Sequence, residues 1–138
     1  MIELTRRYEF PAAHLLSQPS FSEEENRRIY GKCANPNGHG HDYGVEVTVA
    51  GPVAPIGGCI IDLRLLDAIV RERILDRFAH RYLNDDAAFR DLVPTAENIS
   101  RVIHEELAPV IRARSTARLV RVRLRETRKN SFVYGAIE

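Results

Sequence analysis

The chain has 138 residues, of which 44% are hydrophobic and 28% are charged, and its formal net charge is +1. This length fits one domain that buries roughly two-thirds of its unfolded surface, and the composition is that of a globular chain, not a disordered one. The near-neutral charge argues against a nucleic-acid or membrane partner recruited by bulk electrostatics. No apolar stretch approaches the roughly 20 residues needed to span a bilayer.

The cysteines and the N-terminus indicate a reducing compartment. The opening residues, M-I-E-L-T-R-R-Y, lack the apolar core of an export signal. Cys33 and Cys59 have no framework spacing, so we expect free thiols in a cytoplasmic protein and not a disulfide between them. Cys59, in G-G-C-I-I-D, is expected to be a small buried apolar residue.

The first half of the chain predicts two strands separated by a long loop. Residues 2–13 form the first strand, and residues 15–38 form a loop whose length is typical of functional segments. Within this loop, S-E-E-E-N-R-R-I-Y (22–30) predicts a short helix with Ser22 as N-cap. Residues 42–50 form the second strand, since V-E-V-T-V alternates as a half-buried antiparallel strand should.

The second half predicts two helices and a hairpin. After a turn over residues 51–58 and a short strand, one helix begins at the N-cap Asp62 and runs to about residue 82. The other begins at the N-cap Thr95 and runs to about residue 112. Two alternating strands complete the chain, at 118–127 and 132–137.

These elements predict an α+β fold: an antiparallel four-stranded sheet with two helices on one face. The apolar residues along the strands at 42–50 and 118–127 exceed what two helices can cover. We therefore expect other copies of the chain to bury the second face of the sheet or its edges.

Three histidines stand at the ends of the first two strands. His14 closes F-P-A-A-H (10–14), and His39 and His41 lie in K-C-A-N-P-N-G-H-G-H-D-Y (32–43). Being two residues apart on a strand, His39 and His41 project from one face. If the two strands pair antiparallel, His14 lies next to His41. Three imidazoles without a fourth protein ligand are typical of a catalytic zinc ion with an open position.

The thiol of Cys33 lies six residues before His39, close enough to lie over the metal as a nucleophile or base. The simpler alternative is that H-G-H is a polar turn, with Cys33 and His14 as ordinary packing residues. The third histidine, at a matching strand end, favours the metal site.

The motifs resemble those of the 6-pyruvoyl-tetrahydropterin synthase family along essentially the whole chain. Six segments carry the resemblance in the family's order and spacing: F-P-A-A-H, S-E-E-E-N, G-K-C-A-N-P-N-G-H-G-H-D-Y, H-R-Y-L-N (80–84), P-T-A-E-N (94–98) and R-E-T (125–127). The resemblance implies the tunnelling fold, in which the sheets of three chains join into a β-barrel. It also implies a homohexamer of two stacked trimers with active sites at subunit interfaces.

The resemblance implies a role for each residue of the candidate site. His14, His39 and His41 would hold zinc (Zn2+), which polarises hydroxyls of the substrate side chain as a Lewis acid. Cys33 would act as a thiolate base whose pKa is lowered by the nearby cation. His80 would be its partner in proton transfer.

Three further residues would meet the pterin ring. Glu126 would anchor it, because a carboxylate accepts two N–H bonds from the aminopyrimidine edge. Its position on the apolar side of its strand favours such a buried role over that of an exposed charge. Thr95 and Glu97 lie in the segment that lines the pterin pocket in relatives, although helix capping and the helix dipole explain both residues equally well.

One position departs from the family pattern. Relatives carry an aspartate immediately before the catalytic histidine, whereas this chain has Ala79 there. Asp76, four residues before His80, would reach the same ring if the helix persists that far. Otherwise His80 lacks a carboxylate, and the chain would be a weakly catalytic or non-catalytic pterin-binding relative.

The family includes two enzymes that act on 7,8-dihydroneopterin triphosphate. The pyruvoyl type, of tetrahydrobiopterin biosynthesis, eliminates triphosphate and rearranges the side chain to two ketones. The 6-carboxy-tetrahydropterin synthase of queuosine biosynthesis also cleaves that side chain. The five residues between Cys33 and His39, together with S-E-E-E-N, favour a lyase of the pyruvoyl type. An unrelated zinc hydrolase with His80 or Glu126 as base is a more distant alternative, and no motif predicts a nicotinamide or flavin cofactor.

Overall fold

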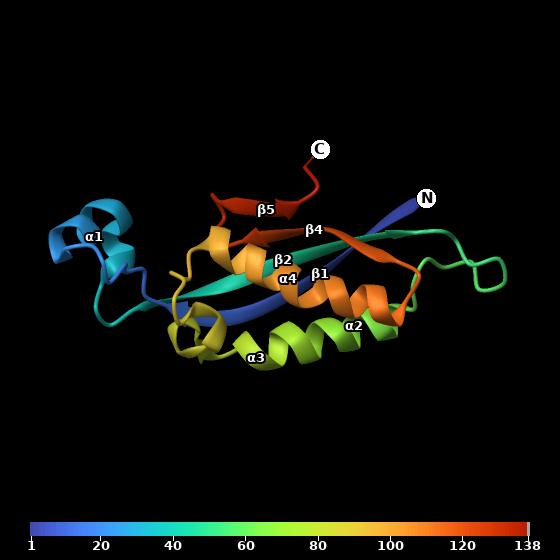
Figure 1. Ribbon diagram of the computed structural model, residues 1–138, viewed down its shortest axis with the longest axis horizontal. Helices are drawn as coiled ribbons and strands as arrows, with labels where there is room; N and C mark the ends of the chain where they lie inside the picture. The colour runs from blue at the N-terminus through green and yellow to red at the C-terminus, as the bar shows by residue number, and fades with distance from the viewer. Residues whose placement is uncertain (138) are drawn as a thin grey trace.

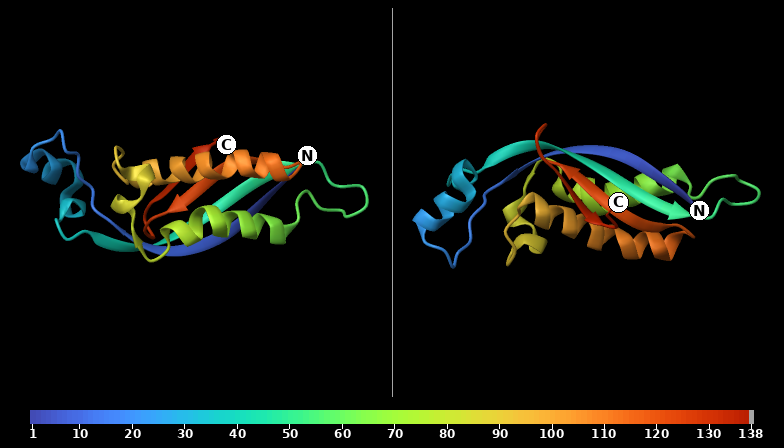
Figure 2. Two further views of the ribbon diagram at one scale, coloured as in Figure 1. Left: turned by 60° about the horizontal axis from the view of Figure 1, so that its bottom comes forward. Right: turned by 90° about the horizontal axis from the view of Figure 1, so that it is seen from above.

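A computed structural model describes residues 1–137 as a mixed five-stranded sheet with helices on one face (Figures 1 and 2). The strand order is β3-β1-β2-β4-β5. The strands are β1 (Ile2–His14), β2 (His39–Gly51), β3 (Arg81–Tyr82), β4 (Arg118–Arg125) and β5 (Ser131–Gly135). The α-helices are α1 (Glu23–Tyr30), α2 (Leu63–Val70), α3 (Asp76–Phe78) and α4 (Ala96–Arg114). Short 3₁₀ turns lie at Gly31–Ala34, Leu83–Asp85 and Ala87–Phe89.

The centre of the sheet is the long antiparallel pair of β1 and β2. The pairing places Phe10 opposite Tyr43, Ala12 opposite His41 and His14 opposite His39. Because successive side chains of a strand alternate between its faces, all three histidines lie on the face that the helices cover. The antiparallel pairing predicted for these strands is confirmed, and the direct cross-strand neighbour of His14 is His39.

The helices begin where the sequence predicts them. The side chains of Ser22, Asp62 and Thr95 each accept a hydrogen bond from a backbone N–H in the first turn of α1, α2 and α4 respectively. The apolar stripes of α2 and α4 pack on the sheet, where the fully buried side chains include Leu66, Ile69, Ile99, Ile103, Leu107, Val47, Val122 and Leu124. This layer is the core of the domain.

The sheet face without helices is polar, so the expectation of an uncovered apolar face is wrong. Its side chains form cross-strand pairs, because charged and hydroxyl residues occupy many of the outward positions of β1, β2 and β4. The two threonine hydroxyls of Thr5 and Thr48 lie 2.8 Å apart. Ion pairs on this face include Arg7–Glu46, Arg121–Glu3, Arg123–Glu46 and Arg125–Glu9. The two helices bury most apolar residues of the strands, while Ile2 of β1 and Tyr134 of β5 stay exposed.

The helix predicted from Asp62 to about residue 82 ends earlier. After α2 the chain forms a π-helical turn, Arg71–Leu75, and the helical segment closes at Phe78. Ala79 is extended, with ψ 131°, and His80 has a positive φ of 60°. Residues 81 and 82 then pair in parallel with Ala12 and Ala13 of β1, which adds the fifth strand that the sequence did not predict.

Residues 52–62 form a loop between β2 and α2 that contains no strand, so the short strand predicted before this helix is not formed. Cys59 is exposed in this loop, contrary to the expectation of a buried residue, while Ile60 and Ile61 beside it are buried. Both cysteines are free thiols, as expected. Within residues 1–137, none of the helices combines the length and the apolar character that crossing a bilayer requires.

Candidate metal centre and active site

The three histidines predicted as metal ligands come together. One ring nitrogen from each of His14, His39 and His41 lies within 4.8 Å of the others. The Nε2 atoms of His14 and His39 are 2.8 Å apart, and the ring of His41 lies 5.0 Å from that of His14 between centroids. Three nitrogens that converge from two paired strands match the donor set of a catalytic zinc site with an open position.

Hydrogen bonds fix the orientation of the innermost histidine. His14 is fully buried, and its Nδ1 lies 2.8 Å from the carbonyl oxygen of Pro94. Since a carbonyl only accepts, Nδ1 carries the proton, which leaves Nε2 as the nitrogen with a free lone pair. Nε2 is also the atom that faces His39.

Two other ring nitrogens of the cluster have no protein partner. Among residues 1–137, the buried Nδ1 of His39 and Nε2 of His41 make no hydrogen bond. Buried polar atoms are normally paired, so such nitrogens beside a third imidazole fit a metal ion. The cluster therefore offers unpaired ring nitrogens of the kind that a metal ion would bind.

The surroundings keep all three rings neutral, as metal ligation requires. Burial, with smaller contributions from the neighbouring His39 and His41, lowers the pKa of His14 to about 4, although the hydrogen bond to Pro94 opposes the shift. Burial is also the largest cause that lowers the pKa of His39 and of His41. A neutral imidazole offers its lone pair without first releasing a proton.

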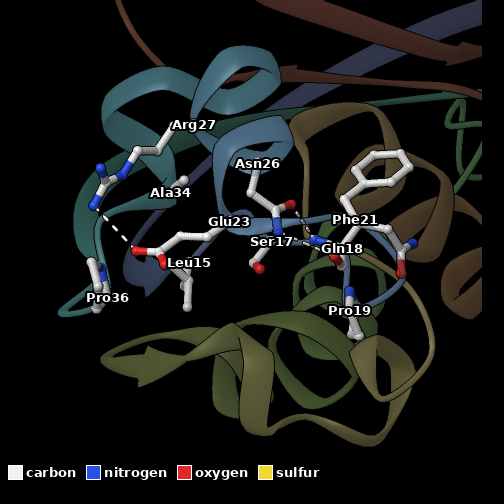
Figure 3. Close-up of a pocket in the computed structure, with 10 residues that line it drawn as sticks. All are labelled: Leu15, Ser17, Gln18, Pro19, Phe21, Glu23, Asn26, Arg27, Ala34 and Pro36. Atoms are coloured by element: carbon white, nitrogen blue, oxygen red, sulfur yellow. Dashed lines mark hydrogen bonds and ion pairs between the residues drawn. The ribbon is translucent and has the colours of Figure 1, made fainter.

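Cys33 sits in a lobe formed by residues 15–38, which carries α1 and stands apart from the helices that cover the sheet (Figure 1). The backbone N–H of Leu16 donates to the carbonyl of Cys33 over 2.9 Å, which ties the thiol segment to the end of β1. Asn26 holds the lobe together, since its amide accepts from the backbone N–H of Gln18 and donates to the Gln18 carbonyl (Figure 3). Gln18 and Asn26 both line a cavity of about 410 Å³.

Glu126 shares this environment with Cys33 and His39. It follows β4 on the helix-covered side, in line with Val122 and Leu124, and it is half-buried. Burial raises its pKa, His39 opposes this, and the charge of Glu97 adds to it. The pKa of the Cys33 thiol is raised by burial and then by Glu126. The protein groups therefore raise the thiol pKa, whereas the resemblance led us to expect a lowered one. A bound cation would have to lower the pKa of Cys33.

Thr95 and Glu97 lie at the start of α4, where Thr95 accepts a hydrogen bond from the backbone N–H of Asn98 at 3.2 Å. Glu97 is exposed on the first turn, and its charge acts on Glu126. Thr95 is thus an N-cap whatever else it binds, while Glu97 lies close enough to Glu126 to face the same ligand.

His80 is the candidate residue that does not join the cluster. It lines a cavity of about 480 Å³ together with Pro11, Ala13, Asp42 and His41 of the cluster. Pro11, Ala13 and Asp42 lie on the face of β1 and β2 opposite the candidate metal ligands, because they alternate with them in sequence. Among residues 1–137, no hydrogen bond or ion pair joins His80 to Cys33 or Glu126.

The helix does not persist as far as His80, which was the condition for Asp76 to reach the His80 ring. The helix ends at Phe78, and the backbone of Ala79 and His80 turns away from helical geometry, where the N–H of His80 donates to the carbonyl of Pro11 at 2.7 Å. The spacing of four residues therefore does not bring Asp76 over the His80 ring. This corrects the idea that Asp76 stands in for the missing aspartate.

The structure adds residues that the sequence reasoning missed. Pro94 and Tyr43 both reach Nδ1 of His14, at 2.8 and 3.2 Å. The side-chain amide of Asn84 accepts a hydrogen bond from the backbone N–H of Leu15, next to His14, and donates one to the carbonyl oxygen of Leu15. Asn84 and Asn26 close the H-R-Y-L-N and S-E-E-E-N segments, so their presence in those motifs was the available signal.

Comparison with known proteins agrees with this geometry. A family model described as 6-pyruvoyl tetrahydropterin synthase matches residues 3–136. The chain belongs to this family. The 6-pyruvoyl tetrahydrobiopterin synthase of Poecilia reticulata is 39% identical over 132 residues, which cover 95% of this chain and 88% of that protein. The human protein of the same name is 38% identical over 133 residues, 96% of this chain and 90% of that one.

A solved structure of a family member has the same fold. The 6-pyruvoyl tetrahydropterin synthase of Caenorhabditis elegans superposes with a TM-score of 0.87 and 34% identity, covering 99% of this chain and 96% of that chain. Membership of the 6-pyruvoyl tetrahydropterin synthase family confirms the resemblance found in the motifs, the tunnelling fold of the single chain and the expectation of a lyase.

Proposed function

We propose that this chain is a zinc-dependent lyase of the 6-pyruvoyl-tetrahydropterin synthase type, acting on 7,8-dihydroneopterin triphosphate in tetrahydrobiopterin biosynthesis. The observation that supports the proposal is a three-histidine cluster in a partly buried environment, where Glu126 and His39 act on each other's charge and Glu126 acts on the thiol of Cys33. The substrate offers a partner to each: hydroxyls to the metal, side-chain carbons to the thiol, and an aminopyrimidine edge to the carboxylate.

The chemistry of each residue suggests its role in the reaction. When bound to the histidines, zinc would polarise the side-chain hydroxyls as a Lewis acid. Glu126 accepts the N–H bonds of the pterin and orients the ring, with Thr95 and Glu97 at the same end of α4. Cys33 removes and returns protons at the side-chain carbons. Elimination of triphosphate and the internal shift of hydrogen then leave two ketones without an external oxidant.

The proposed role of His80 depends on the assembly of several chains. Because it lies away from Cys33 in its own chain, we infer that it serves the site of a neighbouring chain in a homohexamer of two trimers. Free sheet edges support this assembly: β5 is an outer strand, and β3 pairs with β1 only at Ala12 and Ala13. Two free thiols are consistent with a cytoplasmic enzyme.

Mixed oligomers test this arrangement. Cys33→Ala and His80→Ala chains, each inactive alone, should regain activity after they are unfolded together and refolded, because some sites then combine an intact thiol with an intact imidazole. Absence of regained activity, or a monomer in sedimentation equilibrium at micromolar concentration, would contradict the assembly.

The deciding experiment for the reaction is product analysis by mass spectrometry after incubation with 7,8-dihydroneopterin triphosphate. A pyruvoyl product supports the proposal. A carboxy product identifies the queuosine-pathway reaction instead, and binding without turnover identifies a pterin-binding relative that lacks the carboxylate beside His80.

A further inference from the structure

The lobe of residues 15–38, which carries Cys33, is joined to the rest of the chain by few interactions. It leaves the sheet where β1 ends and returns where β2 begins (Figure 1). Apart from the pairing of these two strands, Asn84 is the only residue outside the lobe that forms a hydrogen bond or ion pair with it, within residues 1–137. The place of the thiol relative to the histidine cluster therefore depends on the contact with Asn84.

Asn84 holds both backbone polar groups of one residue at the base of the lobe. Its side-chain amide accepts from the N–H of Leu15 over 2.8 Å and donates to the carbonyl oxygen of Leu15 over 2.9 Å. An amide side chain can serve both groups at once, and the pair of bonds fixes the orientation of Leu15. The next residue, Leu16, donates its N–H to the carbonyl oxygen of Cys33 over 2.9 Å. One step along the backbone thus connects the Asn84 amide to the residue that bears the thiol.

The segment that carries Asn84 is itself firmly held. Leu83 is fully buried in the core, and residues 81 and 82 pair with β1. The other end of the lobe passes the same segment, because a Cβ atom on Gly38 would lie 3.3 Å from the ring of Tyr82. A rigid support therefore meets the lobe at both of its ends, and Asn84 provides the hydrogen bonds.

We propose that Asn84 is a positioning residue, which holds the base of the lobe so that the thiol of Cys33 stays in place beside the histidine cluster. Asn84 acts on the thiol through the backbone of Leu15 and Leu16. The inference rests on the proposed function, since it concerns the group that moves protons in that reaction. Without these bonds the lobe shifts on its two strand ends, and displacement of a reacting group by about 1 Å is enough to lower a rate steeply.

The test follows the thiol and the reaction separately. In a Cys59→Ala background, where Cys33 is the single thiol, Asn84→Ala removes both bonds. Alkylation of the half-buried Cys33 by iodoacetamide should become about tenfold faster, because lost hydrogen bonds shift the local opening equilibrium of the lobe. The kcat for 7,8-dihydroneopterin triphosphate should instead fall at least about tenfold, with KM within about twofold and zinc per chain unchanged.

Ser115→Ala is the matched control. Ser115 likewise accepts from a backbone N–H, that of Ala117 at 3.2 Å, and donates to a backbone carbonyl, that of Ile111 at 2.8 Å. It lies after α4, where Ala117 packs against Gly51 at the end of β2 away from the lobe. Both rates of this variant should match those of the Cys59→Ala parent.

A second variant keeps the test decisive if Asn84→Ala does not fold. Asn84→Asp retains the size of the side chain and its acceptor, but a carboxylate cannot donate to the Leu15 carbonyl, so it should show the same two changes.

The assignment is overturned if either the alkylation rate or kcat stays at the parent's value, if KM rises in place of a fall in kcat, or if zinc is lost in parallel. A parent that turns over no substrate contradicts the proposed function and this inference with it. An active parent whose Asn84 variants are unaffected overturns the Asn84 assignment alone.

Discussion

The Nδ1 atom of His14 donates to the carbonyl oxygen of Pro94 across 80 positions of sequence, at a distance of 2.8 Å. This bond joins the end of β1 to the segment that leads into α4, where Thr95 and Glu97 lie. The orientation of His14, the innermost candidate metal ligand, is therefore coupled to the segment that carries two candidate pterin contacts. Packing of α4 on the sheet holds that segment, so the core helps to keep the histidine cluster in its arrangement.

Metal content should depend on the histidine cluster alone. The purified protein is expected to hold about one zinc per chain, because three imidazoles and an open position suit that ion. His39→Ala combined with His41→Ala should remove most of it, as measured by atomic emission. His104→Ala, in α4 beside Tyr134, is the control and should keep the metal. Full occupancy of the double variant would disprove the assignment.

Stability of the metal-free protein should fall on the acid side of neutrality. Folded His14 takes up a proton only near pH 4, whereas in the unfolded chain it does so near its ordinary value of 6.5. Below that ordinary value the unfolded state binds the proton first, so stability is full above about pH 6.5 and is lost toward pH 4. The shift corresponds to about 3 kcal/mol. Urea unfolding across this range should show the loss, and His14→Asn, which keeps a donor for Pro94, should flatten it.

Cys33→Ala should abolish turnover while zinc content and substrate binding persist, because the thiol does chemistry and the histidines hold the metal. Cys59→Ala, at an exposed site, serves as control and should be fully active.

In the Cys59→Ala protein freed of metal, alkylation of Cys33 should need a pH above the ordinary range of a thiol, since burial and Glu126 raise its pKa. Added zinc should move that midpoint down. An unchanged midpoint would mean that the metal does not act on the thiol.

Glu126→Ala should weaken binding of the pterin itself. Loss of a half-buried carboxylate that accepts two hydrogen bonds costs on the order of 2–5 kcal/mol, which a calorimetric titration with 7,8-dihydropterin resolves easily. The matched control is Glu105→Ala, since that carboxylate pairs with Arg101 on the exposed side of α4. Equal affinities of the Glu126→Ala and Glu105→Ala proteins would remove Glu126 from the site.

Asp76→Asn should leave turnover within about twofold of the parent, because the helix ends before His80 and the carboxylate does not orient that ring. His80→Ala should lower turnover about a hundredfold or more, the usual contribution of a general acid or base. Both rates are measured with the same saturating substrate. A loss in Asp76→Asn comparable to that in His80→Ala would restore Asp76 as the stand-in carboxylate.

The sequence alone determined the features that depend on local periodicity. Alternation along two strands placed His39 and His41 on one face, and antiparallel pairing then brought His14 to them. The caps Ser22, Asp62 and Thr95 could be predicted because capping uses side chains within three residues of the groups that they satisfy. The family motifs supplied the candidate roles of Cys33, His80 and Glu126.

Only the tertiary structure decided what depends on contacts between distant segments. The sequence did not predict the end of the helix before His80, because the apolar spacing of the helix continues past that point. The parallel pairing of residues 81 and 82 with β1, which follows the end of the helix, is a contact between distant segments. The polar second face became clear only once the partners across the strands were known, since Glu3, Arg7 and Glu9 of β1 form ion pairs with residues of β2 or β4. The contact between the Tyr43 hydroxyl and Nδ1 of His14, at 3.2 Å, comes from packing, which no local pattern encodes.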